Sequence, residues 1–477
     1  MTLDRVKTFR RLRWMLWTVS LIVLFASAVS AAEPGWMAGT AKAVITPEKS
    51  LWMAGYGNRD RPADGKLHDL WIRVLAIEDA GGYRGVVLSS DTLGIPKSIY
   101  DNTCAALRET LGLDRSQIML HSSHTHCGPV LRRALNDVYP LDEQQLQWIE
   151  EYSTELENKI VEAVRRAFAN LQPVRLFGGQ GEADFAVNRR NNQEPEVPEL
   201  RKHGALEGPV DHAVPTLAVR ALDDNELTAV VFGYACHNTT LSFYQWCGDY
   251  AGFAQLALEE RHPGCTAMFY MGCGADQNPL PRRTVELARG YGQKLADAVD
   301  EFLPKPMRAF EPKLQTALEL LPLGLGAAPT RAELEKTSAG GSAYQKRWAN
   351  RLLKEMDDGK QWAREYPLPV QVWKLGSEQL WITIGGEVVV DYALGFKKEY
   401  GPDTWVAGYC NDVPAYIPSL RVLEEDVPPR ASSRWGYEGN TSMIVYGMPA
   451  HRWADDIEDR IVASVKRLVE RVNHKSE

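Results

Sequence analysis

Apolar and amphipathic stretches alternate along the chain from residue 37 onward. Short apolar runs bounded by glycine, proline or polar residues predict strands, and longer runs with apolar residues on one helical face predict helices. The predicted strands cover 40–45, 70–77, 85–88, 116–120, 175–179, 217–222, 227–236, 267–271, 370–375, 380–384 and 404–409; the predicted helices cover 98–113, 143–170, 253–261, 284–302, a stretch from about 388, and 451–472. This alternation predicts an α/β fold with mixed sheets flanked by helices, and a parallel βαβ unit within residues 37–135.

The stretch 305–365 breaks this pattern, because it is rich in charge, alanine and other helix-forming residues. Residues 330–333 fit a helical capping box, and Gly340 and Gly341 provide a break after it. We therefore predict a helical excursion, or lid, inserted between two lobes of the fold.

The first 32 residues have the order of a secretory signal peptide. Five basic residues fall within positions 1–13, an apolar run covers 14–28, and small residues follow at 29–32. The apolar run is shorter than the roughly 20 residues that a membrane-spanning helix needs. This favours cleavage after Ala31 or Ala32 over retention as an anchor. It predicts a mature domain of residues 33–477 that is secreted or held in the periplasm or cell envelope.

Charge and cysteine usage exclude some classes of function. The formal net charge of −8 provides no basic surface of the kind that binds nucleic acid, so no nucleic-acid partner is expected. The seven cysteines contain no Cys-x-x-Cys pair, so a structural zinc site of that type is not expected either. We predict that most of them are buried small apolar residues. The sequence leaves the oligomeric state and any disulfide pairing open.

Three of the ten histidines fall within residues 121–126, directly after the predicted strand 116–120. Residues two apart along an extended chain project to the same side, so His124 and His126 can face one cleft. Neutral imidazole is a common metal ligand and a ready acid or base near neutral pH. The alternative is a polar turn in which the imidazoles bond to nearby backbone.

Two further strand ends carry side chains that suit a metal ion. His237 follows the apolar strand 227–236, and Glu387 follows the strand 380–384. Two histidines and one carboxylate, with an open position, form a common catalytic zinc set. Glu387 alone fits equally well as a first-turn glutamate favoured by the helix dipole. The sequence contains neither the His-Glu-x-x-His motif of metalloproteases nor the Gly-x-Ser-x-Gly motif of serine hydrolases.

Two consecutive arginines, Arg189 and Arg190, lie at the start of a polar loop that runs to about residue 208. Such a pair fits a solvated loop. It also fits a guanidinium that holds an anionic or carbonyl oxygen, because the planar fork of donors matches such oxygens.

Over roughly residues 37–447 the chain resembles the catalytic domain of the neutral/alkaline non-lysosomal ceramidases. The motifs that carry the resemblance, in the family's order, are Ala41–Pro47 with Gly55 and Tyr56, Ser90–Asp91, His124–Pro129, Val187–Arg189, Ala235–His237, Gly274–Pro279, Gly385–Glu387, Cys410 through Tyr416, and Tyr437–Gly439. The most specific piece is the family's Thr-His-Thr-His-x-Gly-Pro, in which Ser123 replaces the first threonine here.

The resemblance implies a ceramidase-like α/β catalytic domain that holds one Zn²⁺ ion. The residues that match the family's zinc ligands are His124, His237, Glu387 and Tyr416. The residues that match positions binding substrate or stabilising the reacting carbonyl are His126, Arg189 and Tyr437.

The chain also departs from the family pattern. Gln277 stands where the family has a serine that was a candidate nucleophile, so a serine mechanism is not expected. About twenty residues separate Tyr416 from Tyr437, which predicts a longer loop beside the site. We expect a divergent member without the family's C-terminal immunoglobulin-like domain, and these changes leave the exact substrate open.

Our hypothesis is a secreted zinc-dependent hydrolase that cleaves the amide bond of ceramide or a related N-acyl compound through a metal-activated water. Arg189 and Tyr437 would stabilise the oxyanion, and His126 would carry a proton to the leaving amine. The expected partner is a small N-acyl or lipid substrate, with transient contact to a membrane surface as a further expectation. The alternatives are a zinc esterase or other deacylase, and a non-catalytic binding protein on the same scaffold.

Overall fold

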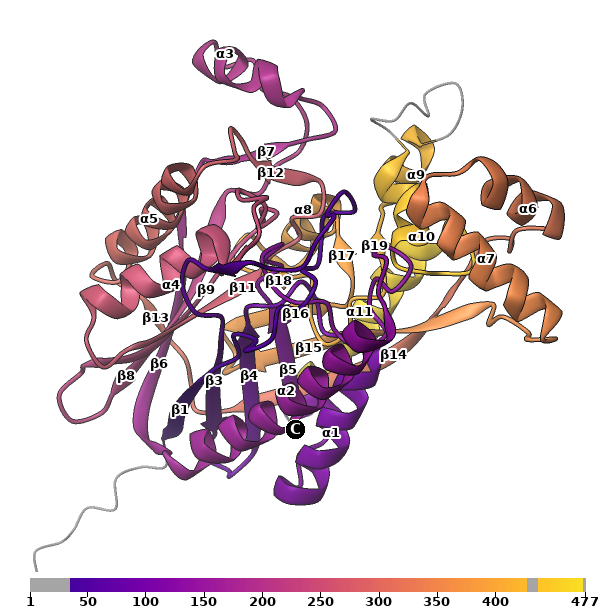
Figure 1. The fold of residues 1–477 in the computed structure, drawn as a ribbon. Coiled ribbons are helices and arrows are strands. Elements are labelled where there is room, and N and C mark those ends of the chain that lie inside the picture. The colour runs from indigo at the N-terminus through magenta and orange to yellow at the C-terminus, as the bar shows by residue number, and fades with distance from the viewer. Residues whose placement is uncertain (1–34, 427–435, 475–477) are drawn as a thin grey trace, which may run out of the picture. The chain divides into compact units, whose positions relative to one another are not determined.

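A nine-stranded mixed sheet forms the centre of the fold (Figure 1). The computed structural model describes residues 35–426 and 436–474, so the predicted signal peptide lies outside the described residues. In sheet order the strands are β11 (Thr266–Met271), β9 (Leu227–Tyr234), β8 (Ala213–Ala221), β6 (Gln172–Glu182), β1 (Trp36–Val44), β3 (Trp71–Glu78), β4 (Arg84–Ser90) and β5 (Ile118–Ser122), and β13 (Arg308–Ala309) pairs with β6.

Two pairs in this sheet are parallel, β4 with β5 and β9 with β11. Helix α1 (Lys97–Leu111) connects the first pair and α4 (Asp249–Arg261) connects the second, as parallel pairing requires. The predicted βαβ unit is therefore confirmed for β4–α1–β5. The earlier strands β1 and β3 pair in antiparallel fashion, so the sheet is mixed, as the predicted fold class states.

A second sheet has four strands, and three pairs of short strands stand apart from it. Its strands are β14 (Leu314–Gly324), β15 (Glu365–Leu375), β16 (Gln379–Ile384) and β18 (Trp405–Ala407). The short pairs are β2 (Gly65–Lys66) with β10 (Gln245–Trp246), β7 (Ala186–Asn188) with β12 (Gln277–Pro279), and β17 (Glu387–Val388) with β19 (Tyr416–Ile417).

The predicted helical excursion over 305–365 is wrong for its first part. Strand β14 occupies residues 314–324 and pairs with β15 along its whole length, and β13 lies just before it. Only α6 (Arg331–Gly340) and α7 (Ala343–Asp357) are helical in this stretch. The leucines of β14 favour a helix locally, but pairing with β15 and packing against α11 override that preference.

Helices cover the outer faces of both sheets. The remaining ones are α2 (Glu143–Ala169), α3 (Val197–Lys202), α5 (Val285–Phe302), α8 (Val390–Tyr400), α9 (Leu420–Glu425), α10 (Ser442–Val445) and α11 (Ile457–His474), with short turns η1 (Arg115–Gln117) and η2 (Glu194–Glu196) and a π-helical turn η3 (Tyr437–Thr441). Helices α1 and α2 pack on one half of the large sheet, α4 and α5 on the other, and α8 and α11 on the small sheet.

The two sheets pack face to face through a core rich in tryptophan. Trp373, Trp381 and Trp405 of the small sheet are buried against Val87 and Met119 of the large one. The result is a four-layer arrangement in which helices enclose two sheets.

The segment after β18 joins the two sheets at one edge. The N–H of Asn411 donates to the carbonyl of Leu120 at 2.7 Å, and the N–H of Leu120 donates to Asn411 Oδ1 at 3.0 Å. The N–H of Ser122 donates to the carbonyl of Tyr409 at 3.3 Å. These bonds bring the carboxyl ends of β5 and β18 together, and ligands in parallel sheets gather at such ends.

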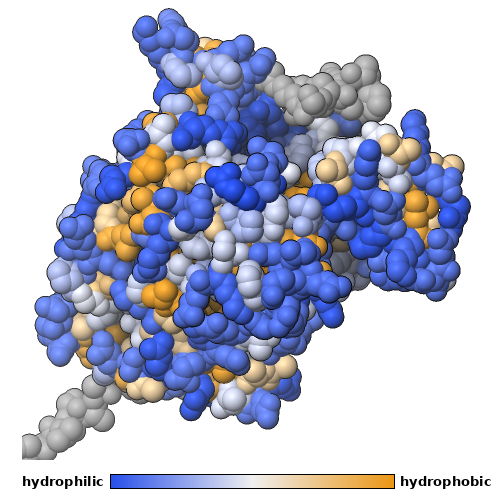
Figure 2. Space-filling model, in the orientation of Figure 1, coloured by the Kyte–Doolittle hydropathy of each residue, from blue (hydrophilic) through white to orange (hydrophobic). Residues whose placement is uncertain are grey.

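Hydrophilic residues cover most of the face shown in Figure 2, and hydrophobic residues gather there in small groups, most clearly over α4 and α5. Within the described residues, no helix combines the length and apolarity that crossing a bilayer requires.

Candidate active site

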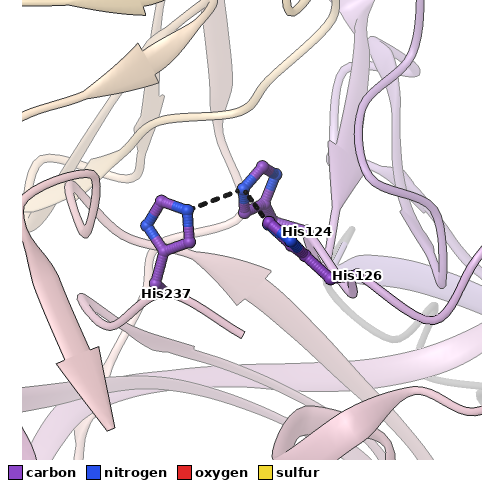
Figure 3. Close-up of side chains that lie close together, drawn as sticks. All are labelled: His124, His126 and His237. Atoms are coloured by element: carbon purple, nitrogen blue, oxygen red, sulfur yellow. Dashed lines mark hydrogen bonds between the residues drawn. The ribbon is translucent and has the colours of Figure 1, made fainter. Parts of the chain in front are cut away.

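Three histidines from two loops meet in a buried site at the carboxyl ends of β5 and β9 (Figure 3). The Nε2 atom of His124 lies 3.0 Å from Nε2 of His237 and 3.2 Å from Nε2 of His126. The three side chains each have a ligand atom within 4.8 Å of the others, a grouping that could hold a metal ion. The strand-end placement predicted from the sequence therefore brings these residues together.

The backbone reason for this convergence differs from the predicted one. His124 has a φ of 57°, in the left-handed region that non-glycine residues rarely adopt, so the loop is not extended there. The imidazoles of His124 and His126 meet edge to face, with ring centroids 4.9 Å apart. A tight turn, rather than the alternation of a strand, points both rings at one space.

The hydrogen bonds of the imidazoles fit a cation at this point. Nδ1 of His124 lies 2.6 Å from the carbonyl of Leu93, and Nδ1 of His237 lies 3.2 Å from the carbonyl of Gly274. A carbonyl only accepts, so each Nδ1 carries the proton and each neutral ring presents a bare lone pair at Nε2. Two lone pairs 3.0 Å apart repel unless a cation or proton lies between them.

Burial disfavours a proton on His237. It lowers the pKa of His237 well below the ordinary value, and the neighbouring His124 and Arg189 lower it further. Burial likewise lowers the pKa of His126. Both rings are therefore neutral at pH 7, which is the form that binds metal ions.

Glu387 adds a carboxylate to the same site. Its Oε2 lies 3.2 Å from Nε2 of His124 and 3.3 Å from Nε2 of His237. Gly386 precedes it with a φ of 82°, and a Cβ there would come within 2.6 Å of Ile417, so the corner requires glycine. The predicted strand-to-helix corner is thus present as β17, directly before α8.

Two tyrosines that sequence reasoning missed hold this carboxylate. Tyr409 donates to Glu387 Oε2 at 3.3 Å, and Tyr446 donates to Glu387 Oε1. Such partners orient a metal-binding carboxylate. Tyr409 directly precedes the Cys410–Tyr416 region that carried the resemblance, but Tyr446 had no signal beyond its position after the loop.

The predicted ligand Tyr416 and the predicted carbonyl-binding pair lie beside the cluster. Tyr416 Oη lies 3.4 Å from Nε2 of His237 and accepts from Arg189 Nη2 at 3.2 Å. The rings of Tyr416 and Tyr437 are 5.2 Å apart, and the Arg189 guanidinium carbon lies 5.8 Å from the Tyr437 ring. All seven predicted site residues therefore share one region of the molecule.

The arginine pair belongs to a buried ionic network, not to a solvated loop. Arg189 Nε donates to Glu438 Oε1 at 2.9 Å. The fully buried Arg190 forms ion pairs with Glu425, Asp426 and Glu438. This network fixes the loop that carries Arg189 against the turn η3 that carries Tyr437.

His126 differs from the other two histidines in its surroundings. Its Nδ1 has no hydrogen-bond partner among the described residues, whereas the Nδ1 atoms of His124 and His237 are held by carbonyls. Metal-binding histidines almost always have such a partner on the second nitrogen. The geometry thus favours Glu387 over His126 as the third ligand, although the three histidines alone form a metal-binding group.

Gln277, at the position of the family's serine, has a supporting role. Its Oε1 accepts from the N–H of Asp211 at 3.1 Å, and its carbonyl accepts from the N–H of His237 at 2.8 Å. The side chain is fully buried, and the backbone carbonyl of Gln277 is the group that holds the loop of His237. Nothing in this arrangement points it at a reacting atom.

Two cavities lie among the described residues near or away from this site. A cavity of about 640 Å³ lies elsewhere, between β14 and α11. An apolar cavity of about 20 Å³ lies next to the site, lined in part by Leu93, Val413 and Tyr446. It has room for little more than one water molecule.

Comparison with known proteins shows related sequences and folds. Residues 36–271 match the family described as neutral/alkaline non-lysosomal ceramidase, N-terminal. The neutral ceramidase of Pseudomonas aeruginosa is 28% identical over 210 residues, which are 43% of this chain and 30% of that protein. Neutral ceramidase B of Dictyostelium discoideum is 24% identical over 220 residues, 44% of this chain and 30% of that protein. The matched stretch thus spans under a third of each relative.

Solved structures extend the likeness to most of the chain at the level of the fold. The crystal structure of the Pseudomonas aeruginosa neutral ceramidase superposes with a TM-score of 0.65 at 20% identity, covering 91% of this chain and 75% of that one. A ceramidase complexed with C2 gives the same TM-score at 19% identity, covering 91% and 76%. These findings confirm the resemblance predicted from the sequence.

The converging lone pairs predict that the metal-stripped protein binds one divalent transition-metal ion per chain. Adding the ion at 100 times its dissociation constant stabilises the fold by about 2.7 kcal/mol, which raises the melting temperature by a few degrees. His237→Ala should abolish the shift, and His203→Ala, an exposed histidine at the end of α3, should keep it. A melting temperature of the wild-type protein that does not change when the metal ion is added would contradict this account.

Proposed function

We propose that this chain, whose residues 36–271 match the family described as neutral/alkaline non-lysosomal ceramidase, N-terminal, is a zinc-dependent hydrolase that cleaves the amide bond of ceramide or a related N-acyl compound. The observation that carries the proposal is the convergence of His124, His237 and Glu387 in one buried site. The names of the related proteins support an action on ceramide.

Zinc fits the set of donors better than other common metals. Imidazole nitrogens with a carboxylate oxygen form the usual catalytic zinc set, in which one position stays open for water or substrate. His124, His237 and Glu387 would supply that set, and the Tyr416 phenol lies close enough to join it. Hard ions such as Mg²⁺ prefer an all-oxygen shell.

The chain's own residues then divide the remaining work. Zinc, when bound, polarises a carbonyl and makes water acidic enough to react near pH 7. Arg189 and Tyr437 would donate to the carbonyl oxygen as it gains charge, and the ion pair with Glu438 holds Arg189 in the required place. Nε2 of His126, with the depressed pKa that burial causes, would take a proton and pass it to the leaving amine.

We propose in addition that the chain is exported. The support is the order of basic, apolar and small residues at positions 1–32. The described residues do not include this stretch, so the proposal rests on sequence alone.

The direct test of the proposed function is a deacylation assay on the zinc-loaded protein. Ceramide and simpler N-acyl amines should release free fatty acid, and an ester with the same acyl chain should react no faster than its amide. His124→Ala, His237→Ala and Glu387→Ala should each lose most bound zinc and nearly all activity. Faster ester cleavage would make the protein an esterase, and ligand binding without turnover at full zinc occupancy would make it a binding protein.

Removing an oxyanion donor should reduce kcat and leave substrate affinity nearly unchanged. Contacts that strengthen only in the transition state act on kcat, and the loss of one such donor typically costs about 100- to 1,000-fold. Arg189→Ala and Tyr437→Phe should show this loss with zinc content preserved, and only Arg189→Ala should lower the melting temperature, because it leaves the buried Glu438 without one of its ion pairs. Tyr400→Phe, at the end of α8, is the matched control. Wild-type turnover in both variants would remove the two residues from the oxyanion site.

Export predicts that the mature protein begins at Ala32 or Glu33. Expression of the full chain followed by mass spectrometry of the exported fraction measures this start. A mature protein that retains Met1 would contradict cleavage.

A further inference from the structure

Three arginines surround Tyr56 beside the histidine cluster, and we refer to Arg59, Arg282 and Arg283 as the arginine rim. The Tyr56 ring lies 4.6 Å from the His126 ring, centroid to centroid. The guanidinium carbons of Arg59 and Arg283 lie 4.9 and 5.9 Å from the centre of the same Tyr56 ring. The rim therefore borders the side of the site on which His126 lies.

Arg59 is a buried cation with only neutral partners. Its Nη1 donates to the carbonyl of Ala54 and its Nη2 to the carbonyl of His126, both at 2.7 Å. Its Nε has no partner, and no ion pair to Arg59 occurs within residues 35–426 and 436–474. Buried charges are normally paired, so this fixed positive charge directly behind His126 is unusual.

The other two arginines share one carboxylate. Arg282 lies 2.8 Å from Glu194, and Arg283 lies 3.8 Å from the same carboxylate oxygen. The Arg283 side chain remains 44% exposed, so it has donors to offer a ligand. Its backbone, at a φ of 101°, is held in place by a 2.7 Å bond from its N–H to the carbonyl of Thr240.

The charge balance around Tyr56 remains positive. Asp249 is the further carboxylate that faces Tyr56, and it already accepts from the N–H groups of Leu241 and Tyr250. Counting Asp249 and Glu194 against the three arginines of the rim leaves one net positive charge.

We propose that the arginine rim binds an anionic group on the amine side of the substrate, so that preferred substrates are N-acyl compounds whose amine carries a carboxylate or phosphate. This inference rests on the proposed amide hydrolysis. The amine side is assigned because the rim borders His126, the residue proposed to protonate the leaving amine. A guanidinium suits both kinds of anion, since its fork of donors matches their paired oxygens.

Three probes with one acyl chain test the rim: N-octanoylglycine with a carboxylate, N-octanoylphosphoethanolamine with a phosphate, and neutral N-octanoylethanolamine. Steady-state assays on the zinc-loaded protein measure KM and kcat/KM of each, and calorimetry measures the dissociation constant of any probe that is not cleaved. The anionic probes should bind about tenfold more tightly than the neutral one, and added salt should weaken only the anionic probes. Whichever anionic probe binds more tightly identifies the anion that the rim prefers.

Arg283→Gln is the decisive variant, because the side chain is exposed and its removal should leave the melting temperature unchanged. It should weaken both anionic probes about tenfold and change the neutral probe less than twofold. Arg175→Gln, an exposed arginine on β6, is the matched control and should change none of the three.

The two proposals fail in different ways. The proposed anion binding by the rim would be wrong if all three probes bind equally, or if Arg283→Gln does not weaken the anionic probes. This holds whether or not the amides are cleaved. Selective, Arg283-dependent binding without cleavage of any probe would overturn amide hydrolysis and leave the rim standing.

Discussion

The contact between two imidazole lone pairs in a buried site constrains the rest of this structure. A backbone carbonyl fixes the proton of each ring, His124 and His237, on Nδ1. Their unprotonated Nε2 atoms therefore face each other at 3.0 Å. Burial lowers the pKa of His237, so a proton on His237 is disfavoured as the means of removing this repulsion. A cation among these atoms removes the repulsion and gains a carboxylate ligand from Glu387. The geometry thus favours a metal ion at this point independently of any comparison with other proteins.

Both sheets are needed to build that site. The histidines extend from β5 and β9 of the large sheet, whereas Glu387 follows β16 of the small one. The tryptophan-rich core presses the sheets together, and the bonds between Asn411 and Leu120 align their edges. Since the parallel strands end at this shared edge, the loops that follow them reach one point. The ionic network of Arg190 then fixes the last piece, the turn η3.

Local sequence was sufficient to predict the strand-end histidines and the Gly-Glu corner, because apolar runs and glycines mark strand ends directly. It failed where non-local packing decides. The left-handed turn at His124 has no glycine to mark it, and β14 is composed of helix formers that form a strand only beside β15. Tyr446 lies 59 residues from Glu387, and the carboxylate partners of Arg190 lie 235 to 248 residues from it, beyond any local pattern. The roles of individual side chains came from the family resemblance, because the spacing of residues along the chain does not indicate them.

The most direct test of the central claim is zinc K-edge X-ray absorption on the zinc-loaded wild-type protein and on His126→Ala. The account predicts two imidazole nitrogens at about 2.0–2.1 Å with oxygen ligands completing the shell, and the same count of imidazoles in the variant. A third imidazole that disappears in His126→Ala would make His126 a ligand and contradict its assignment to proton transfer. A shell of oxygen atoms alone would contradict the metal site itself.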